Sequence, residues 1–404
     1  MKLNFKLSPE LIFNLYFWGF ILLRPILRIA PKYSKAILFT YALLILLLSI
    51  INSIKYKINL NHYKISLLII SILLFDYYAR PNILIGNYIY QFIIYGLIPI
   101  HLISQIRNRK RFLYIFCYFS VISFFAYFWD PFQGYKLSND YMYFGYIVGV
   151  PVFMGLNIGR NFLKIKWLII IEILWLFLLI LYGNRGTILS IILFVIINIT
   201  LFSKSVRTKI IRLVVVFGSV LGIIIFSGRF INLFYESNLA KNPSYSFSQY
   251  KNLLIRGDIE QFYSGRLYIW ELAKKEAKDN MLFGKGTAYF ESKYGAYTHN
   301  IFYDILIEHG IFGVVISSLV ILIIVVRIFN KKAKVNKIIG ILFLCLSFPK
   351  LFFSFYYFKD ISIWCLIAVG LLSNNYYISN EKRYQVFVKE NKRIGKNEDI
   401  GRII

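Results

Sequence analysis

One histidine in this chain lies where its side chain could transfer a proton. His299 follows the only long polar segment of the sequence, and it opens an apolar stretch that begins with Asn300, Glu308, Gly310 and Gly313. The unperturbed pKa of histidine is close to neutral pH, so this side chain suits deprotonation of a hydroxyl group. The alternative is an ordinary polar residue at a membrane boundary.

The residues that follow His299 are expected to share one helix with it. At about 100° per residue, Glu308 lies roughly 180° from His299 around that helix, which argues against a dyad of these two side chains. Asp304 and Glu308 can instead orient a base or contact substrate hydroxyls. Gly310 and Gly313, three residues apart, are expected to allow close packing of helices.

Two arginines have the chemistry of an anion site. Arg185 lies in the polar segment 183–187 between two strongly apolar stretches, and Arg266 opens an amphipathic segment at 266–278. A planar guanidinium is well suited to phosphate, and glycines beside Arg185 let backbone amides approach the same anion. A turn arginine and a solvated charge are the alternatives.

Long apolar stretches make up most of the chain, which is 58% hydrophobic. About 20 apolar residues are needed to cross a membrane as a helix. The fold class is therefore an all-α, polytopic helical bundle of about twelve transmembrane helices. We expect them near residues 9–29, 36–54, 65–79, 83–103, 112–129, 141–160, 165–182, 186–202, 210–227, 300–327, 337–357 and 360–378.

The net charge is +28, and the positions of the basic residues indicate the membrane topology. They concentrate in alternate loops, such as 107–111 and 331–337, which is typical of the cytoplasmic side. Both termini are then cytoplasmic, and residues 229–298 face outward. The basic tail 379–404 is expected to lie beside anionic lipid, so membrane lipid is the expected partner and nucleic acid is not.

The sequence divides into four parts. One membrane domain is interrupted by one external insertion that contains short helices and a glycine-rich turn at 282–286. The expected parts are transmembrane helices one to nine at 1–228, an external loop at 229–298, helices ten to twelve at 299–378, and a cytoplasmic tail at 379–404.

Three cysteines lie inside expected helices. Cys117, Cys345 and Cys365 are spaced for neither a metal site nor a disulfide framework. They are interpreted as small core residues, and we expect no metal and no cofactor.

Four motifs in this order resemble the O-antigen ligase and O-antigen polymerase superfamily of bacterial envelope enzymes. They are Gly-Asn-Arg-Gly-Thr at 183–187, Ser-Gly-Arg with a following Trp at 264–270, Leu-Phe-Gly-Lys-Gly at 282–286, and His-Asn followed by two glycines at 299–313. The resemblance covers roughly residues 165–330, and the last motif is the most specific.

The resemblance implies a GT-C-like architecture and a metal-independent, inverting glycosyltransferase. The donor would be an undecaprenyl-diphosphate-linked glycan at the outer face of the bacterial inner membrane. By motif, His299 would activate the acceptor hydroxyl, and Arg185 and Arg266 would hold the donor diphosphate. Asn300, Glu308 and the glycines would support the site.

Several functions stay open within and beyond the superfamily. A polymerase joins lipid-linked repeat units of O-antigen or capsule, with or without a chain-length regulator, and the long Tyr-rich loop favours it. A ligase moves the finished chain onto lipid A core. A transporter of the same lipid-linked glycan is the alternative of another class, and the absence of a repeated half argues against it.

Overall fold

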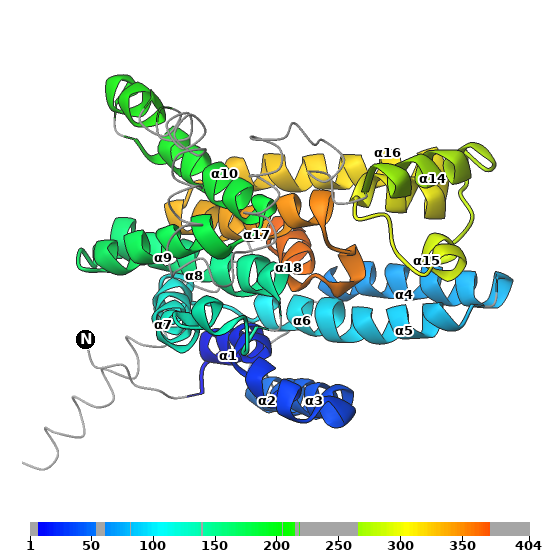
Figure 1. Cartoon of the computed structure of the whole chain (residues 1–404), viewed down its shortest axis with the longest axis horizontal. Coiled ribbons are helices and arrows are strands. Elements are labelled where there is room, and N and C mark those ends of the chain that lie inside the picture. Colours follow the sequence, from blue (N-terminus) through cyan, green and yellow to red (C-terminus); the bar gives the residue numbers. More distant parts are fainter. Residues whose placement is uncertain are drawn as a thin grey trace, which may run out of the picture.

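The computed structural model describes residues 7–53, 61–80, 82–138, 140–203, 205–214, 218 and 266–371. Every regular element in these ranges is helical (Figure 1). The predicted helix 210–227 lies mostly outside the described residues. The same is true of 229–265 in the external loop, including Ser264 and Gly265, and of the tail 379–404.

The N-terminal half forms a bundle of short and long helices. Its elements are α1 (Pro9–Leu22), α2 (Arg24–Ile29), η1 (Pro31–Tyr33), α3 (Ser34–Ser53), α4 (Asn61–Ala79), α5 (Ile83–Phe92), η2 (Ile93–Leu97), α6 (Ile98–Ser104), α7 (Arg109–Tyr127), η3 (Pro131–Gln133), η4 (Tyr143–Gly149), α8 (Val150–Asn161), α9 (Leu168–Tyr182) and α10 (Arg185–Phe202). A helical stretch at 206–214 follows.

The C-terminal half contributes two central helices and the helices that carry the candidate motifs. Its elements are α14 (Arg266–Lys278), α15 (Tyr289–Tyr294), α16 (Ile301–Phe329), α17 (Lys334–Phe353), η7 (Tyr357–Lys359) and α18 (Ile361–Leu371). In Figure 1, α17 and α18 lie among the other helices, whereas α16 runs along one side and carries α14 beside its N-terminal end.

Asparagine side chains set several helix starts. Asn82, Asn108, Asn184 and Asn300 each accept a hydrogen bond from a backbone N–H in the first turn of the following helix. Such caps satisfy N–H groups that have no partner within the helix. Asn184 and Asn300 thereby fix the exact points at which the two motif-bearing helices begin.

Seven helical spans in the described part of the chain are long and apolar enough to cross a membrane, and three further apolar helices are shorter. The chain is therefore a membrane protein of all-helical class. The expected count of about twelve spans, the GT-C-like architecture and the four-part division stay predictions. The spans differ in how deeply they are buried in the bundle. In α17, 72% of the apolar window is buried, whereas in α16 only 11% of the corresponding window is buried.

Two predicted helices contain irregular turns. The stretch 83–103 includes the π-helical η2, and the stretch 141–160 begins with the π-helical η4. A π turn inserts one extra residue per turn and is frequent at functional sites. These two segments lie against the interior of the bundle, where η4 packs on α9 and α10 and η2 packs on α18.

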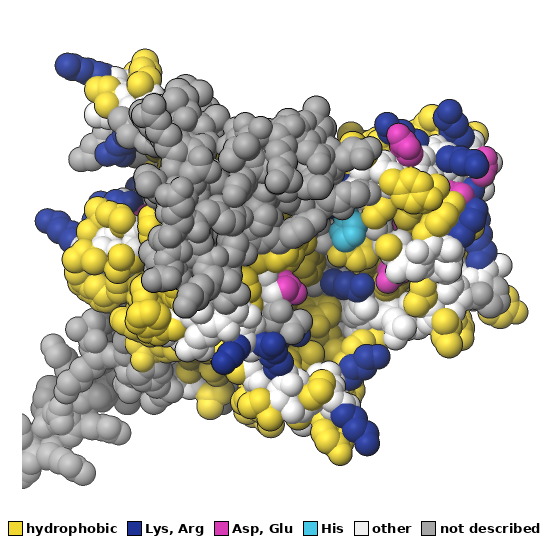
Figure 2. Space-filling view, in the orientation of Figure 1, with side chains coloured by type: hydrophobic (Ala, Val, Ile, Leu, Met, Phe, Trp, Pro, Cys, Tyr) yellow, Lys and Arg dark blue, Asp and Glu magenta, His cyan; other side chains and the backbone are white. Residues whose placement is uncertain are grey.

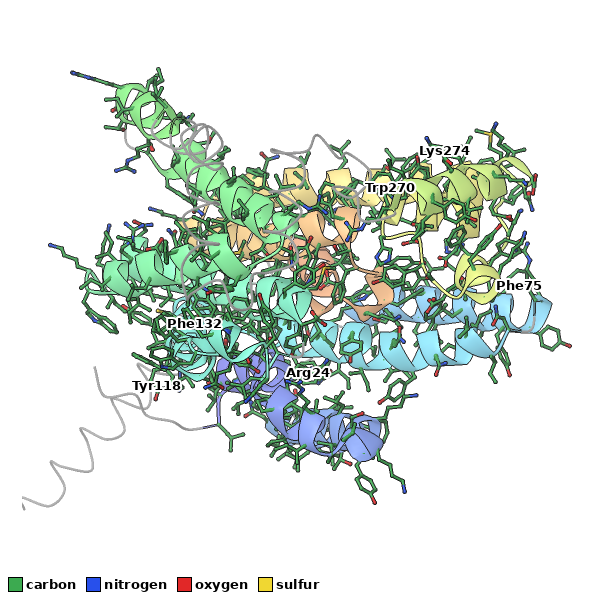
Figure 3. The ribbon with its side chains drawn as sticks, viewed as in Figure 1. Arg24, Phe75, Tyr118, Phe132, Trp270 and Lys274 are labelled. Atoms are coloured by element: carbon green, nitrogen blue, oxygen red, sulfur yellow. The ribbon has the colours of Figure 1, made fainter. Side chains whose placement is uncertain are left out.

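The polar surface is unevenly distributed. Figure 2 shows acidic and basic side chains gathered at the end of the molecule where α14 and α15 lie, with further Lys and Arg side chains at the opposite end and along the lower edge. On α4, Phe75 points away from the bundle (Figure 3) and is 71% exposed.

Candidate functional site

The turn that carries His299 has an unusual backbone. His299 has a φ of 60°, in the left-handed region that non-glycine residues rarely occupy. The buried carboxylate of Asp304 holds this turn by accepting hydrogen bonds from the Thr298 backbone N–H (3.1 Å) and hydroxyl (2.8 Å). Asn300 then caps α16. Such strain persists only where the surroundings fix it, and it clusters at functional sites.

The imidazole of His299 lies partly buried beneath aromatic and cationic groups. Its ring centroid is 4.3 Å from that of Tyr297, whose hydroxyl donates to the Ser354 carbonyl oxygen at 2.8 Å. Burial, and secondarily the positive charge of Arg266, lower the pKa of His299 to about 4. Its Nδ1 atom has no hydrogen-bond partner among the described residues. A neutral imidazole with an unsatisfied nitrogen is the state a general base requires.

Arg266 reaches the same place from the first position of α14. Its Nη2 donates to the Ser354 hydroxyl at 3.2 Å. Trp270, at the N-terminal end of α14 (Figure 3), donates from Nε1 to the Thr298 carbonyl oxygen at 3.1 Å. That bond holds the N-terminal end of α14 against the turn of His299. The side chains of Arg266 and His299 are therefore positioned relative to each other.

Arg185 approaches from α10. Its neighbour Gly186 packs so tightly on Tyr146 that a Cβ atom at Gly186 would overlap the tyrosine hydroxyl. Tyr146 belongs to η4, and its hydroxyl lies 3.4 Å from the Ser354 hydroxyl. Arg185 and Arg266 both lie close enough to interact electrostatically with Tyr146.

The structure therefore brings the three predicted residues together around two others. Ser354 contacts Arg266 directly and His299 through its backbone, and Tyr146 joins Ser354 to the segment of Arg185. Sequence reasoning missed both. Tyr146 is one of 32 tyrosines, and Ser354 follows a long apolar helix without a distinguishing neighbour.

Glu308 has a supporting position away from His299, as its angle on the helix predicts. Its buried carboxylate accepts hydrogen bonds from the hydroxyls of Tyr356 (2.6 Å) and Tyr357 (2.7 Å) and from the Ala288 backbone N–H (3.0 Å). Glu308 thus fastens the segment after α17 and the loop before α15 to α16. The first of these segments contains Ser354.

The expectation for the two glycines is wrong. Gly310 has a φ of 66° and interrupts α16, and a Cβ atom there would overlap the carbonyl of Leu282. A Cβ at Gly313 would meet the side chains of His309 and Ile305, which are residues of α16 itself. The close approach is therefore between the broken helix and a loop, not between two helices.

The loop in question is the predicted glycine-rich turn. Gly284 and Gly286 have φ values of 72° and 93°, and the backbone N–H groups of Lys285 and Gly286 donate to carbonyls of Ile307 (2.7 Å) and Glu308 (2.9 Å). Two glycine motifs that are distant in sequence thus meet backbone to backbone. This pairing explains why both need residues without a side chain.

A second polar cluster stabilises α14, α15 and the turn between them. Buried Glu276 on α14 binds Lys285 and Lys293 at 2.7 Å each and accepts from the hydroxyls of Tyr289 and Tyr294. Although burial acts to raise it, the two lysines and two hydroxyls hold the pKa of Glu276 well below its usual range. This cluster fixes α15 and the glycine-rich turn on α14.

The three cysteines are all buried and unbonded, as small core residues would be. No group of three or more His, Cys, Asp or Glu side chains with the geometry of a metal site occurs within the described ranges. The polar atoms that converge near His299 are instead guanidinium, hydroxyl and imidazole groups, which bind anions and hydroxyls.

Comparison with known families gives one match. Residues 170–318 match the family described as O-antigen ligase. This segment carries Arg185, Arg266 and His299, and its match supports a relationship to the superfamily of O-antigen ligases and polymerases. Members of this superfamily are glycosyltransferase-like enzymes. No curated protein matches the chain.

Proposed function

We propose that the protein is a polymerase of undecaprenyl-diphosphate-linked oligosaccharide repeat units of O-antigen or capsule. It acts at the outer face of the bacterial inner membrane, with both termini cytoplasmic. The growing glycan moves from its lipid diphosphate to a sugar hydroxyl of a new repeat unit. The observation that carries this proposal is the convergence of His299, Arg185 and Arg266 around Tyr146 and Ser354.

In this reaction His299 is the base. The acceptor oxygen attacks the anomeric carbon of the donor from the face opposite the diphosphate, and its proton passes to the imidazole. The bond from that carbon to the diphosphate oxygen breaks with its electron pair, so the product has inverted configuration. Burial keeps the free His299 neutral and ready to accept the proton.

The arginines stabilise the leaving group. Diphosphate gains negative charge as the glycosidic bond breaks, and two fixed guanidinium groups can stabilise it without a metal ion. An anion bound to Arg266 also offsets the positive charge that lowers the pKa of His299. Donor binding would then strengthen the base that the next step needs.

A ligase is the second candidate, because the matching family is described as O-antigen ligase. The ligase would use the same donor and residues but transfer the glycan to lipid A core. The two functions differ in the acceptor alone. A chain-length regulator is an expected protein partner of the polymerase and not of the ligase.

The decisive experiment is gel banding of surface polysaccharide from a deletion strain. Loss of a polymerase leaves a single repeat unit on lipid A core, whereas loss of a ligase leaves none and accumulates chains on undecaprenyl diphosphate. Complementation with wild type should restore long chains, and complementation with His299→Ala should not. Normal chains with His299→Ala, at equal protein abundance, would overturn the catalytic assignment.

A further inference from the structure

A cavity of about 400 Å³ adjoins the site at Tyr146. It lies between the α1–α2 break, the start of α3, η2, η4 and the connection from α17 to α18. Its wall includes basic and aromatic side chains: Arg24, Lys35, Tyr95, Tyr143, Tyr146 and Lys359. Ligand pockets of small molecules span roughly 300–1,000 Å³, so this one can hold a diphosphate with attached sugar.

The cavity wall has an excess of positive charge. Among the described residues that line the cavity, Asp360 is the one carboxylate, and it is paired with Lys350 at 2.6 Å, so these two neutralise each other. Arg24, Lys35 and Lys359 remain. The only carboxylate within ion-pair distance of Lys359 in the described chain is Glu291, at 3.8 Å. This balance favours an anionic ligand.

Arg24 supplies the clearest sign of a missing partner. Its buried Nε atom has no hydrogen-bond partner among the described residues, and its guanidinium carbon lies 4.7 Å from the Tyr143 ring centroid. In Figure 3, Arg24 lies where α1 gives way to α2, beside the rest of the bundle. A buried donor without an acceptor is costly, and a phosphate oxygen would satisfy it.

The remaining walls suit a lipid-linked molecule. Two π-helical segments, η2 and η4, contribute Tyr95, Tyr143 and Tyr146. On the opposite side the cavity reaches Leu38 of α3, a span of which only 17% is buried inside the bundle. An isoprenoid chain attached to a bound diphosphate could therefore leave along the membrane-facing helix, while sugars stack on tyrosine rings.

The cavity and the candidate site are linked through shared side chains. Tyr146 lines it and also bonds Ser354. The Lys359 ammonium lines it and lies 5.4 Å from the ring centroid of Tyr297, the residue whose ring contacts His299. A ligand in the cavity therefore lies one side chain away from the proposed base.

We propose that this cavity binds the diphosphate of a second lipid-linked glycan, the acceptor. Arg24 and Lys359 contact its phosphate oxygens, and Arg185 and Arg266 hold the donor. This inference rests on the proposed function, and it deepens it. Two separate diphosphate sites are what a polymerase needs, since both of its substrates are lipid diphosphates, and what a ligase does not.

Native mass spectrometry with undecaprenyl diphosphate as the probe tests the proposal on the full-length protein in detergent. Wild type should bind two copies. Arg24→Gln and Lys359→Gln should each weaken one copy about tenfold or more, as loss of a charge-assisted hydrogen bond does. Arg185→Gln should weaken the other copy. Lys32→Gln changes an exposed lysine that does not line the cavity, and it should leave the binding of both copies unchanged.

Each other outcome is decisive. If Arg24→Gln and Lys359→Gln still bind two copies, the acceptor site is wrong. If wild type binds one copy that only Arg185→Gln removes, the proposed donor site stands and the cavity proposal fails. If no copy binds, both fail. Equal displacement of the cavity copy by inorganic diphosphate indicates a soluble anion, and equal displacement by phosphatidylglycerol indicates a general lipid contact; either overturns the assignment.

Discussion

The two ends of α16 carry basic side chains, a half-buried histidine and a buried lysine, in very different surroundings. At one end His299 precedes the helix, and at the other Lys331 follows it. Burial lowers the pKa of both, to about 4 for His299 and about 7 for Lys331. By composition and by the direction of the pKa shift, the two ends look alike.

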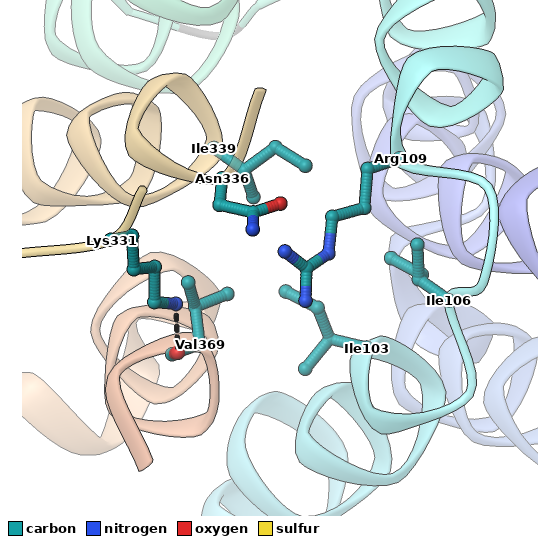
Figure 4. A pocket seen from close by; sticks show the side chains of 7 residues that line it. All are labelled: Ile103, Ile106, Arg109, Lys331, Asn336, Ile339 and Val369. Atoms are coloured by element: carbon teal, nitrogen blue, oxygen red, sulfur yellow. Dashed lines mark hydrogen bonds between the residues drawn. The ribbon is translucent and has the colours of Figure 1, made fainter. Parts of the chain in front are cut away.

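Their free space and hydrogen bonding differ. The Lys331 ammonium donates to the Val369 carbonyl oxygen at 2.7 Å, and the adjoining hollow beside Arg109 and Asn336 measures about 10 Å³, room for about one water molecule (Figure 4). At the other end, His299 Nδ1 lacks a partner in the described chain, and the neighbouring cavity is about 400 Å³. A shifted pKa thus marks burial at both ends, whereas space and unsatisfied polar atoms mark a site at one.

The largest effect is expected from His299→Ala. Removing a general base costs roughly 10²–10⁴ in rate, so glycan transfer by the purified protein should fall by that factor. His309→Ala, on the same helix but outside the proposed machinery, is the matched control and should stay within about twofold of wild type. Equal losses from the two variants would mean that His299 has no special role.

The second largest loss of activity is expected from substitution of the two arginines. Arg185→Gln and Arg266→Gln each remove a donor to the developing charge, for which about 10²–10³ in kcat is expected. Arg185→Lys and Arg266→Lys should recover only part, because an ammonium keeps the charge but not the planar pair of donors. Full recovery by lysine would show that charge alone matters at this end of α16.

Gly310→Ala tests the backbone that supports the site. An alanine at this position would have to adopt a positive φ, and its Cβ atom would overlap the Leu282 carbonyl. Backbone strain of this kind costs about 1–3 kcal/mol. The thermal midpoint should fall. Gly86→Ala is the control, because a Cβ atom there meets no atom within 4 Å. Equal midpoints for the two variants would remove the argument for a glycine at the helix break.

The pH dependence of kcat/KM should report the low pKa of His299. Because the pKa is lowered, the neutral base persists to lower pH, and the rate should stay nearly constant from pH 8 to about pH 5.5. A histidine with the ordinary pKa near 6.5 would lose about tenfold over that range. Arg266→Gln removes a positive charge near the ring, so its acid limb should move to higher pH. If the acid limb of the Arg266→Gln profile does not move, the electrostatic effect of Arg266 on His299 is contradicted.

The smallest effect on glycan transfer is expected from a substitution at Lys331, after the C-terminal end of α16. Lys331→Met should leave transfer within about twofold of wild type. The folded-state pKa of Lys331, about 7, lies below the ordinary value of about 10.5, so the unfolded chain binds more protons between these values and the wild type loses stability as pH falls from about 10.5 to 7. The midpoint of Lys331→Met relative to wild type should therefore be higher at pH 7 than at pH 9.5. A large loss of transfer would place function at both ends.

Much of the architecture follows from local sequence. Continuous apolar length predicts the helices of the described chain, with boundaries usually within a few residues, because a chain in lipid must satisfy its own backbone hydrogen bonds. The caps Asn184 and Asn300 and the positive-φ glycines of the 282–286 turn are likewise local choices. The break of the first predicted helix at Leu23 and the π turns were not predictable, because they depend on packing.

The motifs by themselves selected His299, Arg185 and Arg266 as residues with the chemistry of glycosyl transfer. Only the tertiary structure decided which side chains join them. Tyr146 and Ser354 are separated by 208 positions, and no local pattern distinguishes them from other tyrosines and serines. The loop against Gly310 and the Arg24 cavity also arise from segments that are distant in sequence, whereas the left-handed turn of His299 is held by the nearby Asp304. Residue type fixes what a group can do, but burial, free space and hydrogen-bond partners come from the folded bundle.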